Sequence, residues 1–387
     1  MTPRVAARLG YIALYAAVGA SFPYLPVFYE SRGLSIGTIG LLIALAAAAG
    51  LVGAPVWGIL ADRAAGSRSV MPFAAVAAAT GAGALALVQG PLPIALAVTV
   101  MAMAFAGLGP TLDAGALATL GADRGRWGGL RAVGSASFIV AAIVTGALIE
   151  RAGATSLFVV YVAALALLAV VTLPLRGEAS DARPPGLHGL GLVLRHPVLA
   201  RFLPAVLIVW SAAMSVNWYF SIHLLDLGAP GELVGSAWAI GALVEIPIMA
   251  AYPWLSARVG AERLLLIGAA AFAARVLVLA ISTDPVLATA SMALHGIGFA
   301  LVLVGGVIYV AGHAPPATAA TAQGVLSAIV FSVAMIIGPA VGSWAADAAG
   351  VPAMFALSFG LSLVAIPVLW LATRPRAVPE DREPRVA

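Results

Sequence analysis

The chain contains no cysteine and no lysine, and only 9% of its 387 residues are charged. The lack of cysteine excludes disulfides and thiolate metal sites. A soluble domain carries about 25% charged residues. The low charge, together with 62% hydrophobic residues and a mean hydropathy of +1.06, therefore excludes a soluble enzyme or receptor. The few histidines form no ligand pattern, so we predict neither a metal ion nor a cofactor.

Apolar stretches long enough to cross a bilayer recur along almost the whole sequence. Each crossing needs about 20 consecutive apolar residues. The pattern predicts an all-α membrane protein with twelve transmembrane helices. We place them at about 9–30, 35–60, 69–90, 93–119, 127–149, 154–175, 198–223, 232–256, 264–282, 286–311, 320–346 and 352–373.

Two polar segments divide this series. We predict an N-terminal six-helix half (1–175), a cytoplasmic linker (176–197), a C-terminal six-helix half (198–373) and a cytoplasmic tail (374–387). The N-terminus has features of a signal peptide, with Val18-Gly19-Ala20 as a cleavage site. Because the apolar run continues to Tyr29, we expect an uncleaved first span.

Arginine placement predicts the orientation in the membrane. With the N-terminus inside, only Arg32 and Arg151 of the arginines in loops and termini fall outside the cell. Both termini are therefore expected in the cytoplasm, and the location in a bacterial inner membrane. The positive charges lie in short loops and form no continuous groove, which argues against nucleic-acid binding. We expect a functional monomer whose partners are the lipid bilayer, a small-molecule solute and protons.

The two halves repeat each other. A shift of 195 residues maps Gly33 onto Gly228, Gly40 onto Gly235, Arg63 onto Arg258 and Arg68 onto Arg263. Parallel six-helix halves related by an axis along the membrane normal are one arrangement found in secondary transporters. The sequence therefore predicts two pseudo-symmetric halves.

The segment GILADRAAGSR (Gly58 to Arg68) resembles the signature between helices 2 and 3 of the major facilitator superfamily. The resemblance implies that Gly58, Asp62, Arg63 and Arg68 form a gate motif. Gly58 would permit close helix approach, and Asp62 would cap a helix or pair with arginines that hold the cytoplasmic gate closed. The alternative is an ordinary charged loop that serves only the positive-inside bias.

Further segments narrow the resemblance to one branch of the superfamily. They are GASFPYLPVFYESRGLS, WGGLRAVGSASF, AWAIGALVEIP, AARVLVL and LHGIGFAL. These resemble the branch that contains the phenylpropionate transporter and is related to the oligosaccharide/proton symporters, including the lactose permease. The resemblance covers nearly the full chain and implies alternating access.

Ionisable residues inside spans usually face a water-filled pathway or a partner, because a charge at the bilayer centre costs about 2.5 to 3.5 kcal/mol. Asp113 and Arg131 lie in neighbouring predicted helices 4 and 5. The resemblance to the lactose permease implies that they hold the solute. A structural ion pair is the alternative.

Three ionisable residues lie near the predicted midplane of the C-terminal half: Glu245, Arg275 and His295. They resemble the carboxylate, arginine and histidine of helices 8, 9 and 10 in the lactose permease, which implies proton coupling. The carboxylate one turn after that histidine would fall at Gly298, so coupling would depend on Glu245. Glu245 and Arg275 could instead form a permanent structural brace, and His295 could serve packing.

Tyr24, Asn217 and Trp218 are further candidates for solute binding, on helices 1 and 7. Trp218 could instead be an interfacial anchor. We predict a secondary transporter, not an enzyme, that takes up a small organic solute by proton symport. The alternative is proton-antiport efflux of amphiphilic compounds or drugs. A membrane sensor or embedded enzyme would need a signalling domain or clustered ligands, and neither is evident in the sequence.

Overall fold

The computed structural model describes residues 1–63, 70–120, 127–175 and 187–374, without the side chains of Asp62, residues 127–131 and 187–188, and Ala317. The described residues form helices joined by short turns. In the first half these are α1 (Pro3–Ser21), α2 (Leu25–Ser31), α3 (Ile36–Arg63), α4 (Met71–Leu87), α5 (Pro91–Phe105), α6 (Leu108–Leu120), α7 (Trp127–Ala152), η2 (Ala154–Ser156) and α8 (Leu157–Val171).

The second half begins with α9 (Leu187–Arg195). It continues with α10 (Leu199–Asn217), α11 (Phe220–Asp226), α12 (Gly231–Val259), α13 (Ala261–Ile281), α14 (Pro285–Ala290), α15 (Met292–His313), η3 (Pro316–Thr318), α16 (Ala319–Ala328), η4 (Ile329–Val333), α17 (Ala334–Ala349) and α18 (Val351–Thr373). The helix α9 lies within the segment that the sequence assigns to the linker. Its Val193 is fully buried in the core of the second half.

The predicted all-helical membrane architecture is confirmed. Among the described residues, 11 helical segments are long and apolar enough to span a bilayer. The remaining predicted span corresponds to α4, which has 17 residues and is equally apolar. Several spans consist of two consecutive helices: the first is α1 with α2, the seventh is α10 with α11, and the tenth is α14 with α15.

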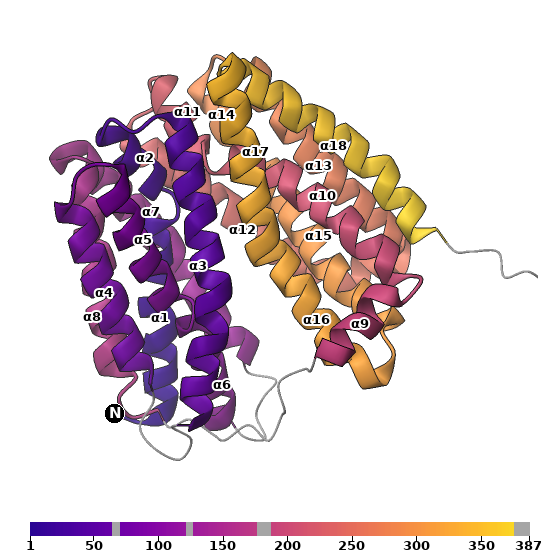
Figure 1. Ribbon diagram of the computed structural model, residues 1–387, viewed down its shortest axis with the longest axis horizontal. Helices are drawn as coiled ribbons and strands as arrows, with labels where there is room; N and C mark the ends of the chain where they lie inside the picture. The colour runs from indigo at the N-terminus through magenta and orange to yellow at the C-terminus, as the bar shows by residue number, and fades with distance from the viewer. Residues whose placement is uncertain (64–69, 121–126, 176–186, 375–387) are drawn as a thin grey trace, which may run out of the picture.

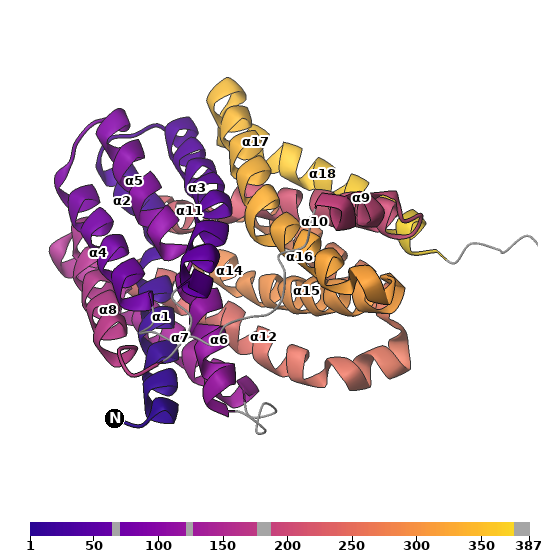
Figure 2. The same cartoon turned by 60° about the horizontal axis from the view of Figure 1, so that its bottom comes forward.

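The helices form two groups that correspond to the two halves of the sequence (Figures 1 and 2). In the first group, α1 packs against α7 and α8, and α3 packs against α5. In the second group, α10 packs against α17 and α18, and α13 against α15. The largest contacts between the groups join α3 to α17 and α7 to α12.

The internal repeat has a structural basis in its glycines. Gly33 and Gly228 follow α2 and α11, and both adopt the left-handed conformation, with φ of 74° and 83°. Glycine tolerates this conformation because it has no Cβ. Gly40 and Gly235 both lie against the opposite half. An added Cβ would stand 2.4 Å from Ser343 Cβ at Gly40, and 2.6 Å from the Ala142 carbonyl oxygen at Gly235.

The halves are closed together at the end of the molecule where α2 and α11 lie, hereafter the outer end. One buried apolar cluster is continuous across both halves there and includes Phe28, Trp218, Trp238 and Phe355. A separate cluster fills the rest of the second half. At the other end, the inner end, α1 begins and α18 ends, and the ribbons of the two halves diverge (Figure 1).

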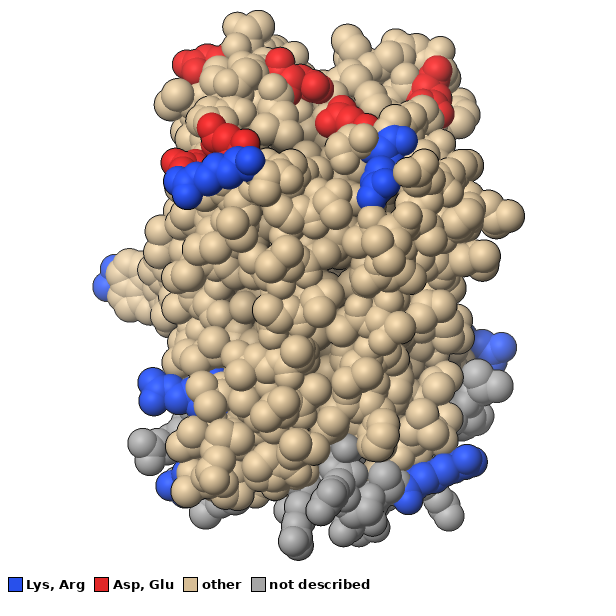
Figure 3. All heavy atoms as spheres, turned by 90° about the vertical axis from the view of Figure 1, so that its left-hand side faces the viewer, with Lys and Arg blue, Asp and Glu red and all other residues tan. Residues whose placement is uncertain are grey.

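Charge is distributed unequally between the two ends. Acidic side chains gather at the outer end and basic side chains mostly toward the inner end, with a band between them that is almost free of charged side chains on this face (Figure 3). The acidic residues at helix ends there are Glu30, Glu150, Asp226, Glu232, Asp284 and Asp347. This band has the surface expected of a segment that lies in hydrocarbon.

Candidate functional site

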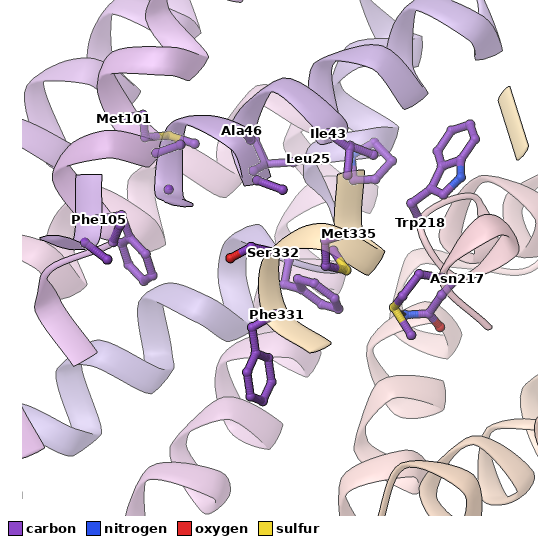
Figure 4. A pocket seen from close by; sticks show the side chains of 18 of the residues that line it. Leu25, Ile43, Ala46, Met101, Phe105, Asn217, Trp218, Phe331, Ser332 and Met335 are labelled. Atoms are coloured by element: carbon purple, nitrogen blue, oxygen red, sulfur yellow. Dashed lines mark hydrogen bonds between the residues drawn. The ribbon is translucent and has the colours of Figure 1, made fainter. Parts of the chain in front are cut away.

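A cavity of about 470 Å³ lies between the two halves. The first half contributes residues of α2, α3 and α5 to its wall, and the second half contributes residues of α10, η4 and α17. In Figure 4, Met101 and Phe105 lie on one side of the view, and Asn217 and Trp218 lie on the other. Ligand pockets have volumes of about 300 to 1,000 Å³, so the space suits a small organic molecule.

Interruptions of the helices supply several wall residues. Phe22 lies where the first span breaks between α1 and α2, and Trp218 lies at the equivalent break between α10 and α11. Phe331 and Ser332 lie in η4, a five-residue π-helical turn. Such turns are rare and often occur at functional sites. The cavity is therefore built at the irregular points of three spans.

Two of the three aromatic and polar candidates from helices 1 and 7 line this cavity. Asn217 is 2% exposed, and its Oδ1 accepts no hydrogen bond from the described residues. Its Nδ2 lies 3.8 Å from the Met214 sulfur. Trp218 donates its indole N–H to the Ser215 carbonyl over 2.8 Å. Tyr24 is buried outside the cavity wall and donates its hydroxyl to the Ala142 carbonyl of α7, in the same half, over 2.7 Å.

The structure places Asp113 in α6, seven residues before that helix ends. Its carboxylate accepts a hydrogen bond from the hydroxyl of Tyr11 in α1. The Arg131 side chain lies outside the described residues, so the predicted contact with Asp113 stays a prediction. Asp113 is not among the described residues that line the cavity.

Glu245 lies in the middle of α12, 14 residues from either end, and is half-buried. The helix α12 packs against α7 of the first half. Farther out, the same helix approaches α7 so closely that a Cβ at Gly231 would stand 2.6 Å from the Gly146 carbonyl oxygen. The helices α7 and α12 are antiparallel, since Gly231 lies opposite Gly146 and Gly235 lies opposite Ala142. If this pairing continues toward the inner end, Glu245 lies at about the level of position 131.

Arg275 and His295 lie next to each other in a buried part of the second half. Arg275 is 1% exposed; its guanidinium lies 4.9 Å from the Phe220 ring centre and 3.4 Å from the Met292 sulfur. His295 is surrounded by aromatic rings, with Trp238 and Phe272 at 6.2 and 5.8 Å between ring centres. No ion pair joins Arg275 to a carboxylate within the described part of the chain.

Gly298 has a packing role at the position where the resemblance would place a second carboxylate. An added Cβ there would stand 2.7 Å from the Phe272 ring. A larger side chain at this position would displace Phe272 from its contact with Trp210 and His295. The missing carboxylate is thus replaced by tight aromatic packing.

The predicted gate motif lies at the inner end of α3. Arg63 is exposed in the last turn of this helix. The Asp62 side chain and all of Arg68 lie outside the described residues. An added Cβ at Gly58 would meet no described atom within 4 Å. Within the described part of the chain, Gly58 makes no close helix approach, and the role of the gate motif stays a prediction.

Sequence reasoning did not identify most of the cavity wall. Ala46, Gly50, Phe105, Phe331 and Met335 line it, but each is an ordinary residue of an apolar span. The one available signal was the helix break at Phe22, because Pro23 follows Phe22 directly.

Comparison with known proteins agrees with this architecture. Residues 7–357 match the MFS_1 like family. The chain is 27% identical over 382 residues to the maltose permease of Geobacillus stearothermophilus, covering 97% of this chain and 96% of the permease. The chain therefore belongs to the MFS_1 like family of the major facilitator superfamily, and it is a multi-pass secondary transporter rather than an enzyme.

Solved structures of transporters share the fold. The nucleoside transporter NupG has a TM-score of 0.85 at 18% identity, covering 97% of this chain and 100% of NupG. A bacterial homologue of the human lysosomal transporter Spinster, in an inward-facing and occupied conformation, has a TM-score of 0.74 at 16% identity, covering 95% of this chain and 96% of its own. Each identity is low enough that these structures bear on the fold alone.

Proposed function

We propose that this chain carries a small organic solute into the cell by proton symport across a bacterial inner membrane, with both termini in the cytoplasm. The position of Glu245 carries the proposal. It is the described carboxylate that lies midway along its span, on a helix that packs against the opposite half. A carboxylate near the bilayer centre raises the free energy of the folded protein, so such residues usually have a function or a partner.

The relatives support transport of a small molecule but differ in solute. The maltose permease and NupG are named for a sugar and for nucleosides. A saccharide, a nucleoside and an aromatic acid all belong to the predicted class of small organic solutes. With the predicted orientation, closure at the outer end corresponds to an inward-facing carrier, a state in which solute and proton would be released into the cytoplasm.

The test is Glu245→Gln, which mimics the protonated carboxyl because the amide is uncharged and nearly isosteric. A carrier that is permanently protonated can still alternate when loaded with solute. Exchange of solute across proteoliposomes should therefore persist, and accumulation driven by a proton gradient should disappear. Both activities are measured on folded, monodisperse protein. The control is Glu232→Gln, which removes a carboxylate from the outer end of the same helix.

Two results would contradict the coupling role. Retained accumulation with normal exchange would remove Glu245 from the mechanism. If Glu245 instead only braces its neighbours, the variant should lose stability, and exchange and accumulation should fall together.

Proton-antiport efflux of amphiphilic compounds is a second candidate, favoured by the apolar wall of the cavity. The same vesicles distinguish the two directions. A proton gradient that is acidic outside drives accumulation by a symporter and extrusion by an antiporter.

A further inference from the structure

The cavity between the halves, hereafter the aromatic chamber, is lined by five aromatic residues: Phe22, Tyr29, Phe105, Trp218 and Phe331. The rest of its described wall is almost entirely aliphatic, and no described residue in the wall is charged. Asp113 and Glu245 both lie elsewhere. The described wall of the chamber is therefore apolar, and these two carboxylates are not part of it.

The chamber offers few hydrogen-bonding partners. Its polar side chains are Tyr29, Asn217 and Ser332, and the Trp218 indole N–H is already donated to the Ser215 carbonyl. A free sugar carries hydroxyls on every side. Each hydroxyl buried here without a partner would lose a large part of its hydration energy. The chamber is thus poorly suited to an unmodified saccharide.

Two of the aromatic residues that line the chamber are not covered by other side chains. Phe22 is 41% exposed and Phe331 is 56% exposed. Phe22 already contacts Trp238 edge to face, with 5.1 Å between ring centres. Aromatic pairs prefer such edge-to-face or offset arrangements, so these rings could pack against one more ring.

We propose that the aromatic chamber binds a hydrophobic ring of the transported solute, and that this ring, rather than a sugar hydroxyl pattern, gives the main selectivity. The solute class is then an amphiphile with one ring-sized apolar part and a polar part that stays outside the chamber. This inference rests on the proposed function in so far as the chain carries an organic solute. It does not depend on proton coupling or on the direction of transport.

The test measures direct binding by titration calorimetry of purified protein in detergent. Two matched pairs of probes keep the polar part constant: phenyl and methyl β-D-glucoside, and phenylacetate and acetate. In at least one pair the aryl member should bind about tenfold more tightly or better, as expected for burial of a ring-sized apolar group. Equal affinity within both pairs, or no saturable binding of either aryl probe up to millimolar concentration, would overturn the proposal.

Two variants locate the ring. Ala46→Phe and Ala102→Phe fill the chamber from α3 and α5. Each should lower the aryl preference, which is the ratio of the two affinities within a probe pair, at least tenfold. Val76→Phe is the control, since Val76 is 56% exposed on α4 and lies outside the chamber wall. Size-exclusion profiles identify misfolded variants. If both filled variants are folded and keep the full aryl preference, the ring binds elsewhere and the proposal is wrong.

The proposed symport can fail separately. Glu245→Gln should keep the aryl preference in detergent whether or not it abolishes gradient-driven accumulation, because Glu245 does not line the chamber.

Discussion

At the scale of single residues, Asn217 is the clearest conflict between stability and function. A buried amide oxygen without a hydrogen-bond partner costs about 1 to 3 kcal/mol. Asn217 nevertheless lies in the wall of the aromatic chamber, where leucine would fit the surrounding side chains. Buried polar groups without a partner are expected mainly at functional sites.

We expect Asn217→Leu to raise the apparent Tm by about 2 to 4 °C, since the unpaired polar atom is removed. Solute exchange in proteoliposomes should slow, because the chamber loses its amide. Ser211→Ala is the matched control: Ser211 is also buried in α10, its hydroxyl has no partner among the described residues, and it does not line the chamber. A lower Tm for Asn217→Leu would mean that the amide is paired in the native protein.

The sequence was sufficient to select candidate residues inside the spans, but it did not predict which residues they contact. Glu245, Arg275 and His295 were selected because charged or titratable groups are rare in hydrocarbon. Their contacts depend on side-chain packing across several helices. Arg275 lies against a sulfur and a phenyl ring, a pairing that no spacing in the sequence indicates.

At the scale of helices, the outer closure includes a cap that crosses between the halves. The Asp347 carboxylate, at the end of α17, accepts the backbone N–H of Gly37 in the first turn of α3 over 3.0 Å. Carboxylates stabilise helix N-termini through this hydrogen bond and through the helix dipole. Unlike an ordinary cap, this one is made only while the halves are closed at the outer end.

Asp347→Ala should therefore shift the equilibrium toward the state that is open at the outer end. Loss of a capping side chain costs about 0.5 to 2 kcal/mol, and 1.4 kcal/mol corresponds to tenfold in the ratio of states. Asp284→Ala is the control, because Asp284 caps α14 within its own half by accepting the Val286 N–H over 2.8 Å.

The shift can be measured as the distance between spin labels on cysteines placed at Ala152 and Ile281. Both positions are exposed at the outer end, on opposite halves. Asp347→Ala should increase the population at long distance, and Asp284→Ala should leave it unchanged. The same distribution in both variants would show that the cap does not hold the outer end closed.

The spans themselves could be predicted because hydropathy depends only on local composition. The break at Phe22 was partly foreseeable from Pro23. The π turn at Ile329–Val333 was not, since nothing in IVFSV differs from an ordinary membrane helix. The chamber was missed for the same reason: alanine, phenylalanine and methionine look alike whether they face lipid or a cavity.

At the scale of the whole molecule, the charge distribution predicts orientation. Arginines collect at the inner end and carboxylates at the outer end, which the positive-inside bias assigns to the cytoplasm and the outside. The chain has no cysteine of its own, so a single introduced cysteine reports the accessibility of one position to a thiol reagent.

A cysteine at Ala182, in the linker beyond the described residues, should resist an impermeant thiol reagent added to intact cells. It should react after permeabilisation. A cysteine at Ala152 should react from outside without permeabilisation. Labelling of Ala182→Cys from outside in intact cells would show that the topology is the reverse of the predicted one.

The π turn η4 also affects how movement passes through the eleventh span. An uninterrupted α-helix behaves as a stiff rod, whereas a π turn is a local irregularity that can bend. On one side of the turn, α17 is fixed against α3; on the other, α16 packs against α9 and α15. The span then consists of two helices joined at a flexible turn, and we expect the angle between α16 and α17 to change when the carrier changes conformation. Spin labels on α16 and α17 that always moved as one body would exclude such a joint.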